Sequence, residues 1–239
     1  YNNGGIGSPN NGYMRKHTRE WLLWYKKQTG FDGVRIDAVK HFETAASEDF
    51  LYNLQNTAGW ANGTDTMFAV GEWVGGTSEL DAWTSGVQSR SGTFDFNLRA
   101  FGTNNALYGM IYGSGGFDMG NIPGTQQNLR YIDVGGTSRI HRTVPFVNNH
   151  DTYRPTFDAN GNITGWNGSS ELSPHVDIRE PRLAPAYAIA CAVDGNPQIF
   201  FEDLFNVANT GKRWTHQPTN TTDLPTNSDL ANIIKAHGA

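Results

Sequence analysis

The stretch GFDGVRIDAVKH, residues 30–41, decides the fold. It contains a short apolar run, typical of a buried strand, that ends on the carboxylate of Asp37. Two later runs end in the same way, one on Glu72 and one on Asp151. The three runs are VRID (34–37), MFAVGE (67–72) and VPFVNNHD (144–151). In a barrel of parallel strands covered by helices, the carboxyl ends of the strands carry the active site. These acids therefore predict a catalytic cluster, and two carboxylates held across a glycosidic bond are the working groups of glycosidases.

Strand and helix patterns alternate along the chain, which predicts an α/β fold with a parallel sheet and crossover helices. Expected strands cover residues 33–37, 67–71, 93–96, 144–148 and 197–201. Expected helices cover residues 12–28, about 47–57, near 97–110, near 182–193 and near 228–236. In the first helix Trp21, Leu22, Trp24 and Tyr25 form a broad apolar stripe, and in the second Phe50, Leu51 and Leu54 share a face. The segment 152–179 is expected to be a long loop, either functional or a tolerated surface insertion.

Composition excludes several classes of protein. A net charge of −5 argues against a nucleic-acid surface. A single cysteine, Cys191, excludes an internal disulfide, and its apolar surroundings predict a buried helix. No apolar run is long enough to predict a transmembrane helix, and no signal peptide is visible. No Cys/His cluster indicates zinc, and neither G-x-S-x-G nor a P-loop occurs.

Three motifs, in order and spacing, resemble signature regions of the α-amylase family of glycoside hydrolases. They are GFDGVRIDAVKH (30–41), FAVGEW (68–73) and FVNNHD (146–151), with FDF (94–96) similar to the sixth strand of that family and GNPQIFF (195–201) to the eighth. The resemblance implies a (β/α)₈ TIM barrel of which residues 1–239 cover about strands 4–8. The first signature region of the family, a strand ending in Asn-His, is absent. We therefore expect that the N-terminal part of the barrel and a C-terminal β-domain are missing from this chain.

Each acid then receives an expected role. Asp37 is the candidate nucleophile, and Arg35, two residues earlier, points to the same face of the strand and favours the ionised carboxylate. Glu72 is the candidate general acid/base, because apolar surroundings favour its protonated form. The resemblance implies that Asp151 hydrogen-bonds sugar hydroxyls in the transition state and that His150 contacts the same ring.

The neighbours of these acids complete the expected site. The resemblance implies that Lys40 lies toward the leaving-group side and that the backbone carbonyl of His41 binds a structural calcium ion, for which an oxygen ligand is suitable. Trp73 is expected either to stack on a sugar face or to shield Glu72. Asp95, at the end of the strand expected at 93–96, is interpreted as structural.

The sequence thus predicts a retaining glycoside hydrolase that cleaves α-1,4-glucosidic bonds in starch, glycogen or maltooligosaccharides. Its expected partner is an α-glucan, with no nucleic acid, membrane or second chain required, and the expected location is extracellular. Two alternatives stay open. One is a transglycosylase or another α-glucan-active relative, which would share the three acids. The other is a carbohydrate-binding fragment that is catalytically inert because its barrel is incomplete.

Overall fold

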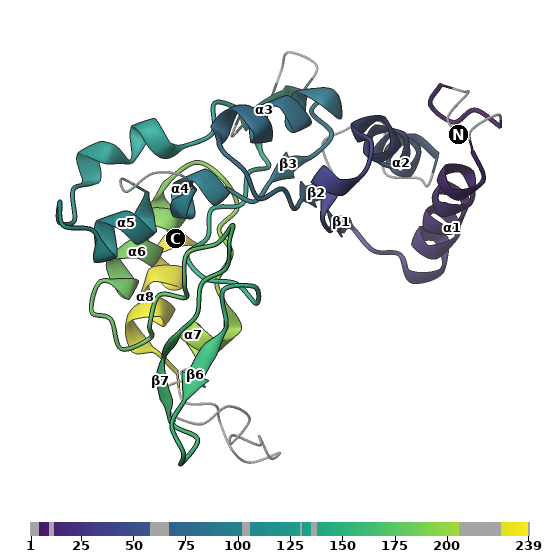
Figure 1. The fold of residues 1–239 in the computed structure, drawn as a ribbon. Coiled ribbons are helices and arrows are strands. Elements are labelled where there is room, and N and C mark those ends of the chain that lie inside the picture. Colours follow the sequence, from purple (N-terminus) through teal and green to yellow (C-terminus); the bar gives the residue numbers. More distant parts are fainter. Residues whose placement is uncertain are drawn as a thin grey trace. The chain divides into compact units, whose positions relative to one another are not determined.

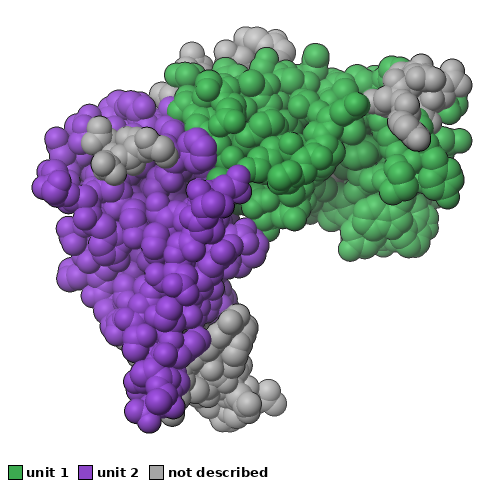
Figure 2. Space-filling view, in the orientation of Figure 1, with its two compact units in different colours: residues 1–94, 127–144 green, residues 95–126, 145–239 purple. Residues whose placement is uncertain are grey.

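The computed structural model describes residues 5–9, 12–57, 67–101, 106–129, 131–134, 138–205 and 226–238. The chain forms two compact units (Figure 2). Unit 1 comprises Tyr1–Phe94 and Gln127–Val144, and unit 2 comprises Asp95–Gln126 and Pro145–Ala239. Within the described residues no helix is long and apolar enough to cross a membrane.

A parallel three-stranded sheet organises unit 1 (Figure 1). Its strands are β1 (Gly33–Ile36), β2 (Phe68–Gly71) and β3 (Gly92–Thr93), in that order. An isolated parallel bridge joins Phe94 to Val144. The parallel pairing predicted from the alternating pattern is therefore present. The strand expected at 93–96 is shorter, because Asp95 caps the helix that follows: its Oδ1 accepts the N–H of Leu98 at 3.0 Å. Asp95 is thus structural, as expected.

Helices α1 (Tyr13–Thr29) and α2 (Thr44–Thr57) pack against each other beside β1 (Figure 1). Helix α1 ends where Gly30 adopts a left-handed conformation, φ 69°, which glycine tolerates without a steric penalty. On α2, Leu51 and Leu54 are fully buried in the unit 1 core as expected, but Phe50 is only half-buried and lines a cavity. The apolar stripe expected on α1 was wrong in part. Leu22 packs on that core, but Trp21, Trp24 and Tyr25 are exposed.

A helix, a hairpin and a 3₁₀ turn of unit 1 were not predicted. Helix α3 (Thr77–Gly86) follows β2, and the side chain of Glu79 in its first turn accepts the N–H of Gly76 at 3.0 Å. An antiparallel hairpin joins β4 (Tyr131–Val134) to β5 (Ser138–His141). A short 3₁₀ turn, η1 (Val39–His41), lies between β1 and α2.

Unit 2 is mainly helical. Its helices are α4 (Phe96–Ala100), α5 (Leu107–Tyr112), α6 (Leu183–Ala192), α7 (Phe201–Leu204) and α8 (Ser228–His237), with 3₁₀ turns η2 (Met119–Asn121) and η3 (Pro123–Thr125). Leu107, Tyr187 and Leu230 belong to its buried core, and α6 packs on α8. The predicted helix at 97–110 is two helices, and residues 102–105 between them lie outside the described residues. Cys191 in α6 is only half-buried, and burial raises the pKa of its thiol.

Two further expectations for unit 2 need correction. The segments 144–148 and 197–201 do not form continuous strands: a single parallel bridge, between Phe146 and Gln198, joins them, and Phe201–Leu204 form α7. The segment 152–179 is not a structureless loop, because β6 (Pro155–Phe157) and β7 (Ile163–Trp166) form an antiparallel hairpin in it. Asp158 stabilises the turn by accepting the backbone N–H groups of Asn160 and Asn162 at 2.8 and 2.9 Å.

Candidate active site

Asp37 and Glu72 follow two neighbouring strands at the same edge of the unit 1 sheet. The register pairs Ile36 with Gly71, so the next residue on each strand is one of the two acids. The N–H of Glu72 donates to the carbonyl oxygen of Ile36 at 2.9 Å, which continues the ladder by one residue. Because parallel strands run in the same direction, the structure brings both carboxylates to the carboxyl edge, as the sequence predicted.

One cation serves both acids. An Nη2–H group of Arg35 donates to Oδ1 of Asp37 at 2.9 Å and lies 3.7 Å from Oε1 of Glu72. The guanidinium also lies 5.4 Å from the ring centroid of Phe94, a cation–π distance. A single guanidinium thus contacts the side chains of both acids. The predicted same-face pair of Arg35 and Asp37 is present.

The two acids differ in exposure. The side chain of Asp37 is 78% exposed and that of Glu72 is 14% exposed. Asp37 also lines a cavity of about 850 Å³ in unit 1. Most of its wall is apolar and includes Leu22, Val34 and Phe50, but polar residues such as Arg15 and Glu43 line it as well. An open carboxylate beside a sheltered one provides two different environments, which is how paired carboxylates acquire different roles.

The backbone after Asp37 holds Glu72 in place. The N–H of Ala38 donates to Oε2 of Glu72 at 2.9 Å, and the N–H of Val39 donates to the Glu72 carbonyl oxygen at 3.0 Å. Ala38 adopts a left-handed conformation with φ 48°, unfavourable for a residue with a Cβ. Backbone strain of this kind persists where surrounding contacts enforce it, often at functional sites. These contacts of Ala38 and Val39 were not foreseen, and no sequence pattern marks them.

The remaining predicted residues of unit 1 lie around this pair. Lys40 is half-buried in η1 and its Nζ donates to the carbonyl oxygen of Val74 at 3.5 Å. Trp73, directly after Glu72, is half-buried and packs in part against the unit 1 core. His41 is exposed at the end of η1.

The described residues do not complete a calcium site around His41. Nowhere among them do three or more His, Cys, Asp or Glu side chains gather as a metal-binding group. Calcium takes six to eight oxygen ligands, and the carbonyl of His41 would be one of them. The donor set within the described parts of the chain therefore does not fit the ion by itself.

His150 and Asp151 lie on a hydrogen-bonded turn in unit 2. His150 Nε2 is 3.4 Å from Asp151 Oδ2, and both side chains reach solvent, with 60% and 35% exposed. The side chain of Arg154 donates to the carbonyl oxygen of Asp151 at 2.9 Å. The residues on either side of this pair are buried, and Asn149 Oδ1 accepts the N–H of Thr152 at 2.9 Å. Asn149 and Thr152 were not among the predicted site residues.

Comparisons with known proteins find several α-amylases similar to this chain. No family model matches the chain. It is 26% identical over 195 residues to the glucan 1,4-alpha-maltohexaosidase of Bacillus sp. (strain 707), covering 81% of this chain and 31% of that protein. It is 25% identical over 209 residues to alpha-amylase 3, chloroplastic, of Arabidopsis thaliana, covering 81% and 19%. The alpha-amylase of Bacillus licheniformis is 24% identical over 196 residues, covering 82% and 32%.

A solved structure, that of an alpha-amylase from Malbranchea cinnamomea, matches with a TM-score of 0.53 and 17% identity, covering 95% of this chain and 40% of that one. This likeness shows that the chain has the fold of part of that enzyme. The chain spans about a third or less of the length of the curated relatives it matches.

Proposed function

We propose that this chain, a relative of the α-amylases, carries the catalytic acids of a retaining glycosidase that cleaves α-1,4-glucosidic bonds in starch, glycogen or maltooligosaccharides. The observation that carries the proposal is the pair formed by Asp37 and Glu72 at neighbouring strand ends, joined through Arg35. An exposed carboxylate beside a sheltered one, at the carboxyl edge of parallel strands, is the arrangement that covalent glycoside hydrolysis needs.

In the first step the carboxylate of Asp37 attacks the anomeric carbon, while the proton of Glu72 passes to the departing glycosidic oxygen. The bond to the leaving sugar breaks and a glycosyl ester forms on Asp37. In the second step Glu72 takes a proton from water, the hydroxide attacks the same carbon, and Asp37 leaves as a carboxylate. Two inversions give a product that retains the α-configuration.

The other residues have supporting roles in this proposal. Asp151 and His150 would bind hydroxyls of the sugar ring whose glycosidic bond is broken, and Lys40 would contact the leaving-group side. Trp73 would shield Glu72, a role that its partial packing against the unit 1 core supports. Arg35 would hold Asp37 ready to attack, because their contact at 2.9 Å already exists.

The proposed frame is a (β/α)₈ barrel in which this chain supplies strands four to eight. Its support is the parallel pairing in chain order: β1 with β2 and β2 with β3, then Phe94 with Val144, and Phe146 with Gln198. In such a barrel the free edge of β1 would pair with a strand from outside these residues. A calcium ion at the His41 carbonyl would likewise take most of its ligands from elsewhere, and an extracellular location belongs to the same proposal.

Product analysis tests this function. The full native polypeptide that carries these residues should release reducing ends from starch, with the α-anomer appearing first by NMR. Transfer of glucosyl groups between maltose molecules without net hydrolysis would favour the transglycosylase alternative. Binding of maltooligosaccharides without any turnover would favour the inert alternative, and an initial β-product would contradict retention.

A further inference from the structure

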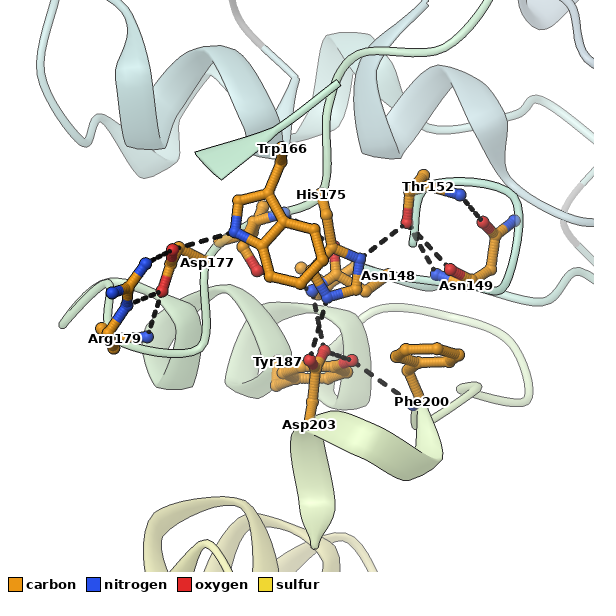
Figure 3. A network of polar contacts seen from close by, with 12 residues as sticks. Asn148, Asn149, Thr152, Trp166, His175, Asp177, Arg179, Tyr187, Phe200 and Asp203 are labelled. Atoms are coloured by element: carbon orange, nitrogen blue, oxygen red, sulfur yellow. Dashed lines mark hydrogen bonds and ion pairs between the residues drawn. The ribbon is translucent and has the colours of Figure 1, made fainter. Parts of the chain in front are cut away.

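A buried network of hydrogen bonds in unit 2 reaches the turn that carries Asp151 (Figure 3). Oδ1 of Asp203 lies 3.2 Å from Nε2 of His175, and Nδ1 of the same ring lies 3.0 Å from the hydroxyl of Thr152. Both ends of the His175–Asp203 pair are fully buried. The Thr152 hydroxyl in turn accepts the backbone N–H of Asn149 at 3.1 Å. Thr152 directly follows Asp151, so this network of hydrogen bonds ends beside the candidate catalytic group.

Two side chains besides His175 bind the carboxyl group of Asp203. Oδ2 of Asp203 accepts the hydroxyl of Tyr187 and an amide N–H of Asn148, both at 2.7 Å. Burial, and then the charge of Asp203, raises the pKa of Tyr187 well above its usual value, so its hydroxyl remains a donor. Nε2 of His175 faces the other oxygen, Oδ1, of the same carboxyl group. The Thr152 hydroxyl has two acceptors within reach, Nδ1 of His175 at 3.0 Å and the carbonyl oxygen of Asn149 at 3.0 Å, and the tautomer of the His175 ring decides which of them takes its proton.

The ring of His175 cannot easily move within this arrangement. Trp166 of β7 stacks on it with ring centroids 4.3 Å apart, and Tyr153 meets it edge-on at 5.3 Å. Asn148 exchanges two hydrogen bonds with the backbone of Val176, at 2.9 and 3.0 Å, which fixes the segment that carries His175. The hairpin of β6 and β7 therefore supplies a wall for the ring and does not simply extend into solvent.

We propose that His175 is a positioning residue for Asp151. Through the hydroxyl of Thr152 it holds the turn from Asn149 to Thr152, and so fixes the direction in which Asp151 faces its ligand. The inference rests on the proposed function in one respect, since it takes Asp151 to act on a sugar. The contacts from Asp203 through His175 to Thr152 act in series, so the loss of any one of them removes the same support from the turn.

Four variants of the full native polypeptide test this role. Thr152→Val keeps the shape of the side chain but removes the hydroxyl, whereas Thr152→Ser keeps the hydroxyl. His175→Phe keeps an aromatic ring against Trp166 but removes both nitrogens. We expect Thr152→Val and His175→Phe each to lower kcat on starch about 10- to 100-fold, since a displacement of about 1 Å has effects of this size. Thr152→Ser should stay close to the native protein. The double variant that combines Thr152→Val with His175→Phe should lose no more kcat than either single variant, because the effects of contacts in series are not additive.

A stability control separates positioning from general weakening. Leu230→Ala leaves a cavity at a core position of unit 2 that is far along the sequence from the turn. It should lower the melting temperature at least as much as Thr152→Val and His175→Phe do. At temperatures well below its melting temperature it should leave kcat unchanged. Amide exchange provides a readout that needs no activity. The N–H of Asn149 should exchange faster in Thr152→Val and His175→Phe than in the native protein and in Thr152→Ser.

The outcomes distinguish this inference from the proposed function. If Asp151→Asn abolishes hydrolysis while Thr152→Val and His175→Phe keep native kcat, the positioning role is overturned and the proposed function stands. If the native protein does not hydrolyse α-glucans, the proposed function fails. The exchange rate of the Asn149 amide then tests the positioning role by itself. An unchanged rate in both Thr152→Val and His175→Phe would show that His175 does not hold the turn. Losses of kcat that add up in the double variant would also contradict contacts that act in series.

Discussion

The backbone N–H of Ala38, the residue after Asp37, donates a hydrogen bond to Oε2 of Glu72 over 2.9 Å. The candidate nucleophile and the candidate acid are therefore fixed to each other through the main chain as well as through Arg35. A displacement of either strand end displaces both groups. This coupling makes the pair sensitive to changes that touch neither carboxylate.

Replacement of the candidate nucleophile should remove nearly all turnover. Asp37→Asn keeps the size of the side chain but removes the attacking charge, and we expect kcat to fall about 10⁴-fold or more while α-glucan binding remains. Initial rates on starch and binding isotherms with maltooligosaccharides check both parts. Asp32→Asn is the matched control, because the Asp32 side chain is 98% exposed. Turnover close to native in Asp37→Asn would remove the assignment.

The loss caused by changing the acid should depend on the leaving group. In Glu72→Gln the amide oxygen can still accept the N–H of Ala38, so the local backbone should be kept. We expect starch hydrolysis to fall about 10²- to 10⁴-fold, the usual contribution of general acid–base catalysis. Glycosyl transfer from an activated aryl α-glucoside, whose leaving group needs no protonation, should fall far less. Equal losses on both substrates would contradict the role of Glu72 as the acid.

A methyl group at position 71 should disturb the strand end below Glu72. A Cβ on Gly71 would lie 2.4 Å from Cη2 of Trp83, a fully packed ring of the unit 1 core. We expect Gly71→Ala to lower the free energy of unfolding by about 1–3 kcal/mol, as overpacking does. Gly115→Ala is the control, since a Cβ there meets no atom within 4 Å. Urea unfolding of the two variants compares them, and equal midpoints would show that the strand end can adapt.

Asp177 should contribute stability that is lost in acid. Burial acts to raise the pKa of Asp177, but hydrogen bonds from the side chain and backbone of Arg179 and from Trp166 outweigh it and hold the pKa at about 2. A carboxyl whose pKa is depressed on folding stabilises the protein above its unfolded pKa of about 3.9, and this contribution disappears as the pH falls towards 2.

The variant Asp177→Asn measures that contribution. Because the carboxylate is partly exposed and solvent screens its ion pair, we expect a loss of only about 1 kcal/mol at pH 7. The difference between the variant and the native protein should shrink between about pH 4 and pH 2. Urea midpoints at several pH values check this. A difference that stays constant across the range would mean that the charge of Asp177 plays no part.

The elements that could be predicted are those whose signals lie in residues close together in the sequence. The runs ending on Asp37 and Glu72 are apolar, short and preceded by helices, so their parallel pairing and shared edge followed from the sequence. Helix α1 ends at Gly30 as expected for a glycine that adopts a positive φ. The same reasoning misjudged the stripe of Trp21, Trp24 and Tyr25, because periodicity shows which residues share a face and not what covers that face.

The contacts that could not be predicted join residues far apart in the sequence. Thr152 and His175 are 23 positions apart, and His175 and Asp203 are 28 apart. No spacing rule links them, since their meeting depends on how the β6–β7 hairpin folds back. The turn-rich residues 158–162 did carry a signal for that hairpin, but the short strands on either side offered too few alternating positions to show it.

The most direct test of the central claim is to trap and locate the glycosyl-enzyme. A fluorinated α-glucosyl substrate that forms the ester quickly and hydrolyses slowly should leave a sugar on the full native polypeptide. Proteolysis and mass spectrometry would then locate it. The account predicts an adduct on Asp37 that is absent from Asp37→Asn. An adduct on any other residue would contradict the account.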